Sequence, residues 1–172
     1  MILKIIGSAI VILASSYIGF AFSKDCSRRP QELRDLQAML QIFENEISYL
    51  SNLLTDAFEK VYKSSNSTVS VFFEKTVEFL REGNMNASQA WEKAVRNKIG
   101  TTALKNEDEE ILVSFGKMLG NSDLAGQIKN IQLTMYQIKL QEQKAEALRK
   151  KYETMYKTLG VLGGTALVIM LV

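Results

Sequence analysis

Apolar side chains recur at steps of three and four residues along much of the chain, a spacing that places them on one face of an α-helix. The clearest stripe lies between residues 33 and 61. Its members are Leu33, Leu36, Leu40, Phe43, Ile47, Leu50, Leu54, Ala57 and Val61. Arg29-Pro30 precedes the stripe, and proline is tolerated in the first turn of a helix. The pattern alone allows one helix through Val61, with Ser51-Asn52 as the only plausible break.

A further helix is predicted after the polar loop from Lys63 to Ser67. Its inner face consists of Val69, Phe72, Phe73, Thr76, Val77 and Leu80. Gly83-Asn84 ends it, because glycine readily adopts the left-handed conformation that follows many helices. Asn86 with Gln89 three residues later is a capping-box pattern that opens the next helix. Trp91 falls on the inner face of that helix, and we expect it to be a core residue.

Four consecutive carboxylates, Glu107, Asp108, Glu109 and Glu110, form the most acidic segment of the chain. Asn106 with Glu109 repeats the capping-box pattern, so a helix is expected to begin here. The simplest interpretation is that the helix dipole favours negative charge in the first turn. The alternative is that these four residues contact a basic partner. A metal site is less favoured, because adjacent carboxylates point around a helix and do not converge.

The longest predicted helix begins near Leu124, after Gly120 has ended the preceding one. Leu124, Ile128, Ile131, Met135 and Ile138 keep a seven-residue repeat. From Gln141 to Lys151 the apolar positions thin out, so this stretch cannot be buried on a broad face. We therefore expect the first half of the helix to pack in a bundle and the second half to form a stalk. No segment shows a strand pattern, which predicts an all-α fold.

Both ends of the chain are apolar. Ile5 to Phe22 is 18 residues without a charge, or about 27 Å of helix, close to the ~30 Å hydrocarbon core of a bilayer. Thr158 to Val172 has 15 residues, or about 22 Å, and Tyr152 and Tyr156 before it fit an interfacial aromatic belt. The sequence therefore predicts two transmembrane helices, one at each end of the chain.

Basic residues flank the inner side of both apolar runs. They are Lys24, Arg28 and Arg29 after the first run, and Arg149, Lys150, Lys151 and Lys157 before the second. The positive-inside rule then divides the chain into a transmembrane helix at 1–23, a cytosolic bundle with its stalk at 24–157, and a transmembrane helix at 158–172. Both termini would lie on the opposite side of the membrane. Two alternatives stay open: the first run could be a signal peptide cleaved near Ala21-Phe22-Ser23, and the second could be a buried core helix.

Small residues occur in pairs within both apolar runs. Ser15 and Gly19 are four residues apart, as are Gly160 and Gly164. Such pairs lie on one helix face and let helices approach closely in lipid. We expect these four residues to pack the membrane helices, although short apolar runs often contain such pairs by chance.

Composition excludes several classes of function. The chain has 172 residues with 21 basic and 19 acidic side chains, so no basic face large enough for nucleic acid is expected. It has no histidine and one cysteine, Cys26, which rules out an internal disulfide, histidine-based catalysis and the common Cys/His zinc sites. No phosphate-binding loop or dinucleotide motif is found. We expect no enzymatic activity, no cofactor or metal, and no small-molecule substrate.

Short features follow one another in order along nearly the whole chain. They are Arg29-Pro30 with Leu33, Arg34, Leu36 and Leu40; Glu46-Ile47 with Tyr49; Ala90-Trp91; Phe115-Gly116 with Leu119-Gly120 and Asp123; Gln127 with Ile131; and Leu159-Gly160 before the apolar tail. Together with the two apolar ends, this ordered set resembles the stage III sporulation protein AB family of endospore-forming bacteria.

The resemblance implies a cytosolic part similar to the helical domain of type II secretion F proteins, with a turn near Ser51-Asn52 and about six helices. Secretion F proteins carry two such domains and three membrane spans, whereas this chain would have one domain and two spans. A noncatalytic scaffold or platform subunit is implied, in the sporulation channel complex that links mother cell and forespore. Its location would be the mother-cell membrane around the forespore.

The implied partners are other stage III sporulation A-type proteins, among them the secretion-type ATPase stage III sporulation protein AA. A secreted or surface bundle and a general membrane adaptor unrelated to sporulation are the alternatives. The oligomeric state stays open.

Overall fold

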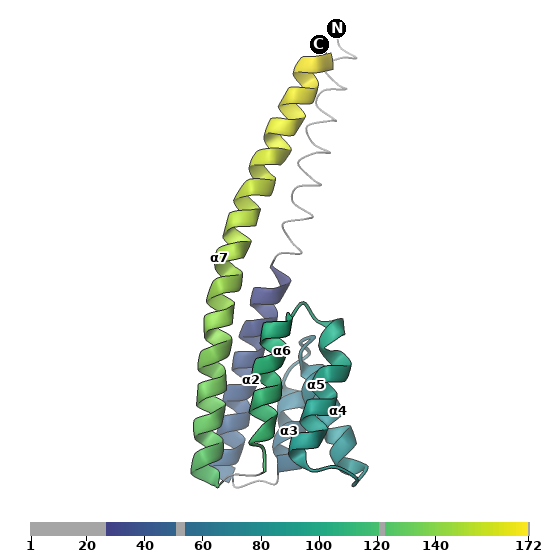
Figure 1. Ribbon diagram of the computed structural model, residues 1–172, viewed down its shortest axis with the longest axis vertical. Coiled ribbons are helices and arrows are strands. Elements are labelled where there is room, and N and C mark those ends of the chain that lie inside the picture. Colours follow the sequence, from purple (N-terminus) through teal and green to yellow (C-terminus); the bar gives the residue numbers. More distant parts are fainter. Residues whose placement is uncertain (1–26, 51–53, 121–122, 172) are drawn as a thin grey trace. The chain divides into compact units, whose positions relative to one another are not determined.

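The computed structural model describes residues 27–50, 54–120 and 123–171. Within these ranges it contains six α-helices, one short 3-10 helix and no strand (Figure 1). The elements are α2 (Arg28–Leu50), α3 (Leu54–Ser64), α4 (Ser70–Arg81), α5 (Ala87–Lys98), η1 (Ile99–Thr101), α6 (Asn106–Lys117) and α7 (Leu124–Leu171). The predicted all-α fold with about six helices and a long final helix is confirmed for this part of the chain.

The chain divides into two compact units, residues 29–143 and residues 1–28 with 144–172. The helical core belongs to the first unit, called the bundle below. Among the described residues, no helix is both long enough and apolar enough to cross a membrane. Ser15, Gly19 and Cys26 lie outside the described residues. Gly160 and Gly164 belong to α7, but their surroundings also lie outside the description.

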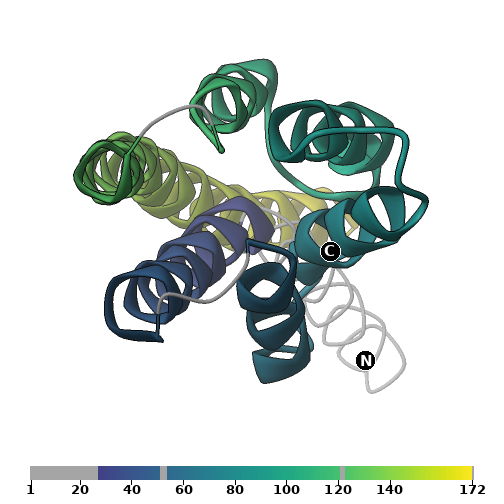
Figure 2. The same cartoon turned by 90° about the horizontal axis from the view of Figure 1, so that it is seen from below.

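Most of the apolar stripe of the first half of the chain is buried as predicted, although Leu54 is half-buried and the side chain of Leu50 lies outside the description. Leu33, Leu36, Leu40 and Phe43 are all fully inaccessible to solvent. The stripe is divided between α2 and α3, and the predicted break at Ser51-Asn52 falls in the undescribed residues between these two helices. Helices α3, α4, α5 and α6 then pack against one another in chain order (Figure 2).

The predicted capping box at the start of α5 is confirmed. The backbone N–H of Gln89 donates to the side chain of Asn86 over 2.9 Å, and the N–H of Asn86 donates to the side chain of Gln89 over 3.2 Å. Gly83 and Gly120 have φ angles of 75° and 73° in the segments that follow α4 and α6. They therefore act as the predicted helix-ending glycines, since residues other than glycine rarely adopt these backbone angles.

The predicted capping box at the start of α6 is wrong by one residue. The helix does begin at Asn106, but the backbone N–H of Lys105 donates to Oδ2 of Asp108 over 2.8 Å. Glu109 instead forms an ion pair with Arg96 of α5 at 3.6 Å. The shorter Asp108 side chain satisfies the free donor, and Glu109 is drawn to a charge on the neighbouring helix.

Trp91 lies at the centre of an aromatic core, as predicted. Its ring centroid is 5.6 Å from that of Phe58, 5.1 Å from that of Phe73 and 5.3 Å from that of Phe115. The indole N–H donates to the Leu112 carbonyl oxygen over 2.7 Å, so the one polar atom of this buried ring is satisfied.

Gly116 of α6 lies directly against the Trp91 ring. A Cβ atom added at Gly116 would be 2.5 Å from Cδ1 of Trp91, too close for any side chain. The sequence pairs Ala90-Trp91 and Phe115-Gly116, both part of the family resemblance, thus meet in the core of the bundle.

The seven-residue repeat predicted for α7 describes its packing only in part. Ile131 and Ile138 are 1% exposed, but Leu124 is 47% exposed. Polar Asn130 and Thr134 are also buried on this helix, next to the isoleucines. Asn130 is held there because its amide donates to the Phe115 carbonyl in the last turn of α6, over 3.1 Å.

Candidate functional site

The four carboxylates of the predicted partner contact lie in different environments. Asp108 is 1% exposed, whereas Glu107 and Glu110 are exposed and Glu109 is half-buried. Asp108 forms a bidentate ion pair with Arg29, with 2.8 Å from Nε to Oδ2 and 2.9 Å from Nη2 to Oδ1. The Asp108 carboxylate is buried and paired with Arg29, so only Glu107, Glu109 and Glu110 are accessible to another protein.

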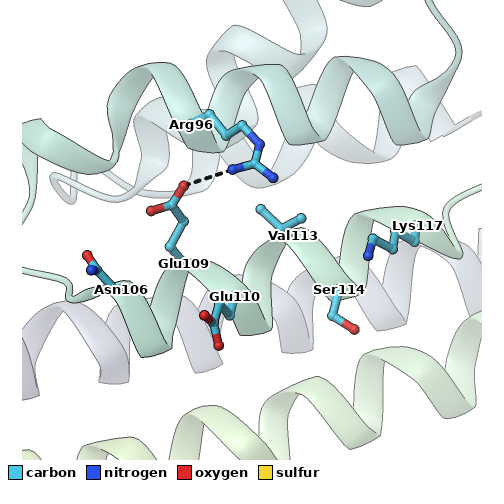
Figure 3. Close-up of a pocket in the computed structure, with 7 residues that line it drawn as sticks. All are labelled: Arg96, Asn106, Glu109, Glu110, Val113, Ser114 and Lys117. Carbon is cyan, nitrogen blue, oxygen red and sulfur yellow. Dashed lines mark ion pairs between the residues drawn. The ribbon is translucent and has the colours of Figure 1, made fainter.

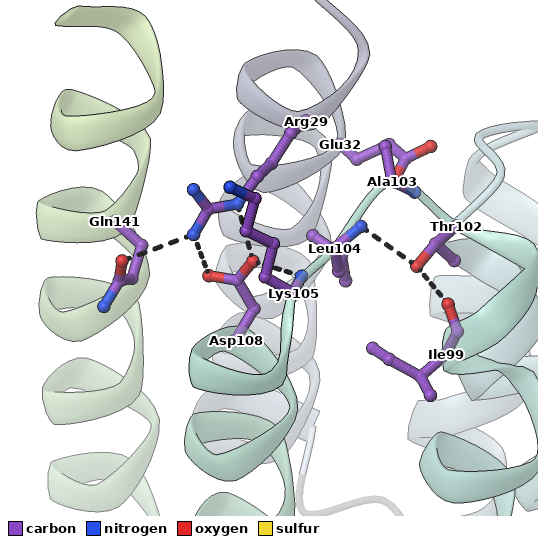
Figure 4. A network of polar contacts seen from close by, with 9 residues as sticks. All are labelled: Arg29, Glu32, Ile99, Thr102, Ala103, Leu104, Lys105, Asp108 and Gln141. Carbon is purple, nitrogen blue, oxygen red and sulfur yellow. Dashed lines mark hydrogen bonds and ion pairs between the residues drawn. The ribbon is translucent and has the colours of Figure 1, made fainter. Parts of the chain in front are cut away.

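A polar network surrounds the Arg29–Asp108 pair at the start of α6 (Figure 4). Oδ2 of Asp108 also accepts the backbone N–H of Lys105, and Nη2 of Arg29 reaches Oε1 of Gln141 in α7 at 3.4 Å. One turn along α2, Oε2 of Glu32 accepts the backbone N–H of Ala103 over 2.6 Å. The network therefore connects the segment before α6 to α2 through hydrogen bonds, and Gln141 of α7 also contacts it.

Arg29 does not lie where the sequence predicts. The prediction places it among the basic residues that flank the first apolar run at the membrane. In the structure its guanidinium group is directed into the bundle toward Asp108 (Figure 4). The positive-inside argument for this flank then rests on Lys24, which lies outside the described residues, and Arg28.

A shallow hollow of about 420 Å³ lies between α5 and α6 (Figure 3). Its lining comprises Arg96 of α5 and Asn106, Glu109, Glu110, Val113, Ser114 and Lys117 of α6. Glu109 points toward Arg96, while Glu110 and Ser114 point to the other side of α6. The hollow is polar and carries charges of both signs, which suits contact with a charged surface.

Of the four consecutive carboxylates, Glu107 and Glu110 are the two that form no ion pair with any described residue. They are three positions apart in α6, so they lie next to each other on the helix surface. Two neighbouring carboxylates of this kind bind lysine or arginine side chains through charge-assisted hydrogen bonds. Among the four carboxylates of the predicted partner contact, these two are therefore the ones available to a partner, with Glu109 beside them.

Buried polar side chains in the described part of the chain form hydrogen bonds inside the bundle, either to another segment or, for Thr76 and Thr134, to the carbonyl four residues earlier in the same helix. They are Arg29, Glu32, Thr76, Asp108, Asn130 and Thr134, and each has a hydrogen-bond partner. Among the described residues, no three carboxylate or cysteine side chains gather where they could hold a metal ion.

Sequence reasoning missed two features of this region. The pairing of Arg29 with Asp108 leaves no local pattern, because the partners are 79 residues apart. Leu133, Tyr136 and Leu140 form a second apolar row on α7 that is exposed to solvent. Their spacing of three and four residues is a signal that the sequence does contain.

Comparison with known proteins identifies the family. A family model described as "Stage III sporulation protein AB" matches residues 4–172. Stage III sporulation protein AB of Bacillus subtilis (strain 168) is 34% identical over 169 residues, which cover 98% of this chain and 99% of the relative. A solved structure of a stage III sporulation protein AB is similar with a TM-score of 0.68 and 32% identity, covering 72% of this chain and 98% of that one. The chain therefore belongs to the stage III sporulation protein AB family.

Proposed function

We propose that the chain is a noncatalytic, membrane-anchored scaffold in the sporulation channel complex that links mother cell and forespore. The observation that carries the proposal is the use of polar groups in the bundle. Buried ones such as Arg29 and Asp108 connect helices, while free carboxylates lie outside on α6. A rigid bundle with a charged outer face is suited to hold partners together. Membership in the family supports a role in sporulation.

The membrane anchor in this proposal consists of the two apolar runs, residues 5–22 and 158–172. Their lengths and the basic residues on their inner flanks favour a bundle on the cytosolic side. Helix α7 extends from Leu124 to Leu171, so its residues belong in part to the bundle and in part to the proposed C-terminal anchor. The mother-cell membrane around the forespore is the proposed location.

The partner in this proposal is the secretion-type ATPase, stage III sporulation protein AA, in a platform role similar to that of type II secretion F proteins. Glu107 and Glu110 are the proposed contact, because a basic surface would neutralise two adjacent free carboxylates. The mechanism is positional: the anchors fix the bundle at the membrane, and its acidic face recruits the ATPase.

Charge reversal at this face is expected to weaken recruitment. In the variant Glu107→Lys/Glu110→Lys, lysines would oppose a basic partner, and like charges brought together cost several kcal/mol, so binding should fall by at least about tenfold. The measurement is co-purification of the ATPase with the tagged full-length chain from detergent-solubilised membranes.

The matched control is Asp56→Lys/Glu82→Lys. It changes the net charge equally, alters two exposed residues, and like the test variant reverses one acid in the first turn of a helix. The control should retain the ATPase at the wild-type level. Equal retention by both variants would exclude Glu107 and Glu110 as the contact.

A further inference from the structure

Helix α7 has a second apolar face that points away from the core. Leu133, Tyr136 and Leu140 are 55%, 60% and 40% exposed, whereas Ile131 and Ile138 are buried on the opposite side of the helix. A single exposed apolar residue is ordinary in a soluble domain. A row at positions i, i+3 and i+7 is the arrangement with which one helix packs against another. This face is therefore suited to a helical partner.

The charged side chains that α7 itself places beside this row are lysines, and Glu44 of α2, which also lies near the row, accepts a hydrogen bond from Gln132 over 2.7 Å. Lys129 and Lys139 are exposed on either side of it, and neither has an ion-pair partner among the described residues. The nearby acid on α7, Glu142, already accepts hydrogen bonds from Arg34 over 2.7 Å and from Gln37 over 3.2 Å. A partner that carries carboxylates would therefore complement these two lysines.

We propose that this face of α7, formed by Lys129, Leu133, Tyr136, Lys139 and Leu140, binds an acidic amphipathic helix of another protein. Apolar side chains of that helix would cover the Leu-Tyr-Leu row, and its flanking carboxylates would pair with the two lysines. The surface is separate from Glu107 and Glu110 of α6, so the inference goes beyond the proposed contact with the ATPase.

A second copy of the chain is a poorer occupant of this face. Two copies anchored in one membrane would present their α7 helices in parallel, so Lys129 would face Lys129 and Lys139 would face Lys139. No free carboxylate of α7 lies between these lysines to offset the repulsion. A partner that supplies its own carboxylates meets no such obstacle.

The test uses a defined peptide and the full-length chain in nanodiscs of neutral phosphatidylcholine. The probe is a fluorescent, hydrocarbon-stapled peptide of about four helical turns, with leucines at i, i+3 and i+7 and glutamates beside them, because short unstapled helices are marginal in water. A second peptide has lysines in place of the glutamates. Fluorescence anisotropy should show the acidic peptide binding at least about tenfold more tightly than the basic one.

Two variants distinguish this face from other surfaces. Lys129→Glu/Lys139→Glu should invert the preference, so that the basic peptide binds more tightly; a gain of binding cannot result from unfolding. Leu133→Asn/Tyr136→Asn should weaken the acidic peptide by at least about tenfold. Glu107→Lys/Glu110→Lys should leave its affinity unchanged, which separates this inference from the proposed ATPase contact.

Three results would overturn the inference. One is equal binding of both peptides, or an unaltered preference in the charge-reversed variant. Another is a cross-link from a photoreactive residue at Tyr136 to a second copy of the chain, which would assign the face to self-association. The third is peptide binding that disappears when anionic phosphatidylglycerol is added to the nanodisc, which would assign the face to lipid.

Discussion

Replacing Asp108 with alanine is expected to lower the free energy of unfolding by about 3 to 5 kcal/mol, since it leaves the buried Arg29 guanidinium without its counterion. The same change removes the acceptor for the Lys105 backbone N–H at the start of α6. The measurement is guanidinium denaturation of a fragment of residues 24–157. Unfolding is monitored through the fluorescence of Trp91, the only tryptophan of the chain. The solved structure of a stage III sporulation protein AB aligns with 72% of this chain over 98% of its own length, which supports the use of such a fragment.

Neighbouring carboxylates provide the control for this prediction. Alanine at Glu107 or at Glu110 should change the free energy of unfolding by less than about 0.5 kcal/mol, because both side chains are exposed. Removing both partners, as in Arg29→Met/Asp108→Leu, should restore most of the stability, because no uncompensated charge is then buried. If Asp108→Ala costs no more than Glu107→Ala, the ion pair does not hold α6 to α2.

Replacing Trp91 with alanine is expected to cost about 3 to 5 kcal/mol of unfolding free energy. The change opens a cavity among the rings of Phe58, Phe73 and Phe115 and removes the hydrogen bond to the Leu112 carbonyl. Because the variant loses its only tryptophan, denaturation is followed by circular dichroism at helical wavelengths.

Two further variants test whether the loss of stability comes from the buried aromatic packing at Trp91. Trp91→Phe keeps an aromatic ring in the core and should cost clearly less than Trp91→Ala. Tyr136→Ala removes an aromatic side chain that is 60% exposed, and should change stability by less than about 0.5 kcal/mol. Similar losses at Trp91 and Tyr136 would contradict the packing described for the bundle.

Much of the fold is predictable because its causes are local. The three- and four-residue spacing of Leu33, Leu36 and Leu40 identifies a helix and its buried face without knowledge of the partner helices. The capping box of Asn86 and Gln89 likewise involves residues three positions apart. Such signals fix the existence and approximate boundaries of helices, and the structure agrees with them apart from the one-residue shift of the capping box at α6.

What the sequence misses depends on contacts between distant segments. Arg29 has the same local context whether it faces a membrane surface or a buried carboxylate, and only packing of α2 against α6 decides this. Helix α7 has two apolar rows, and periodicity alone cannot say which row faces the bundle. The seven-residue repeat includes Leu124, which is exposed, and passes over Asn130, which is buried through its bond to Phe115.

The candidate site shows the same limit. The acidic run is obvious in the sequence, and its position in the first turn of α6 follows from helix-dipole reasoning. Which carboxylates remain free depends on Arg29 and Arg96, which come from two other helices. The acidic turn can therefore be located from the sequence, but which of its four carboxylates form no ion pair cannot.

The residues on which the family resemblance rests are important mainly for the packing of the bundle. Trp91 and Gly116 meet in the core, where the indole ring occupies the space that any side chain at position 116 would need. Residues of this kind preserve the bundle whatever it binds, so function has to be argued from surfaces. On this chain the acidic face of α6 and the basic, apolar face of α7 are the two surfaces for which we propose partners.

The side of the membrane on which the bundle lies tests the scaffold proposal most directly. Asn97 is exposed on α5, so the variant Cys26→Ser/Asn97→Cys carries one thiol on the bundle surface. A membrane-impermeant maleimide should label this thiol only after the cells are permeabilised, and the full-length chain should stay in the membrane pellet after a carbonate wash. Labelling in intact protoplasts, or release of the chain by carbonate, would contradict a cytosolic bundle held by membrane anchors.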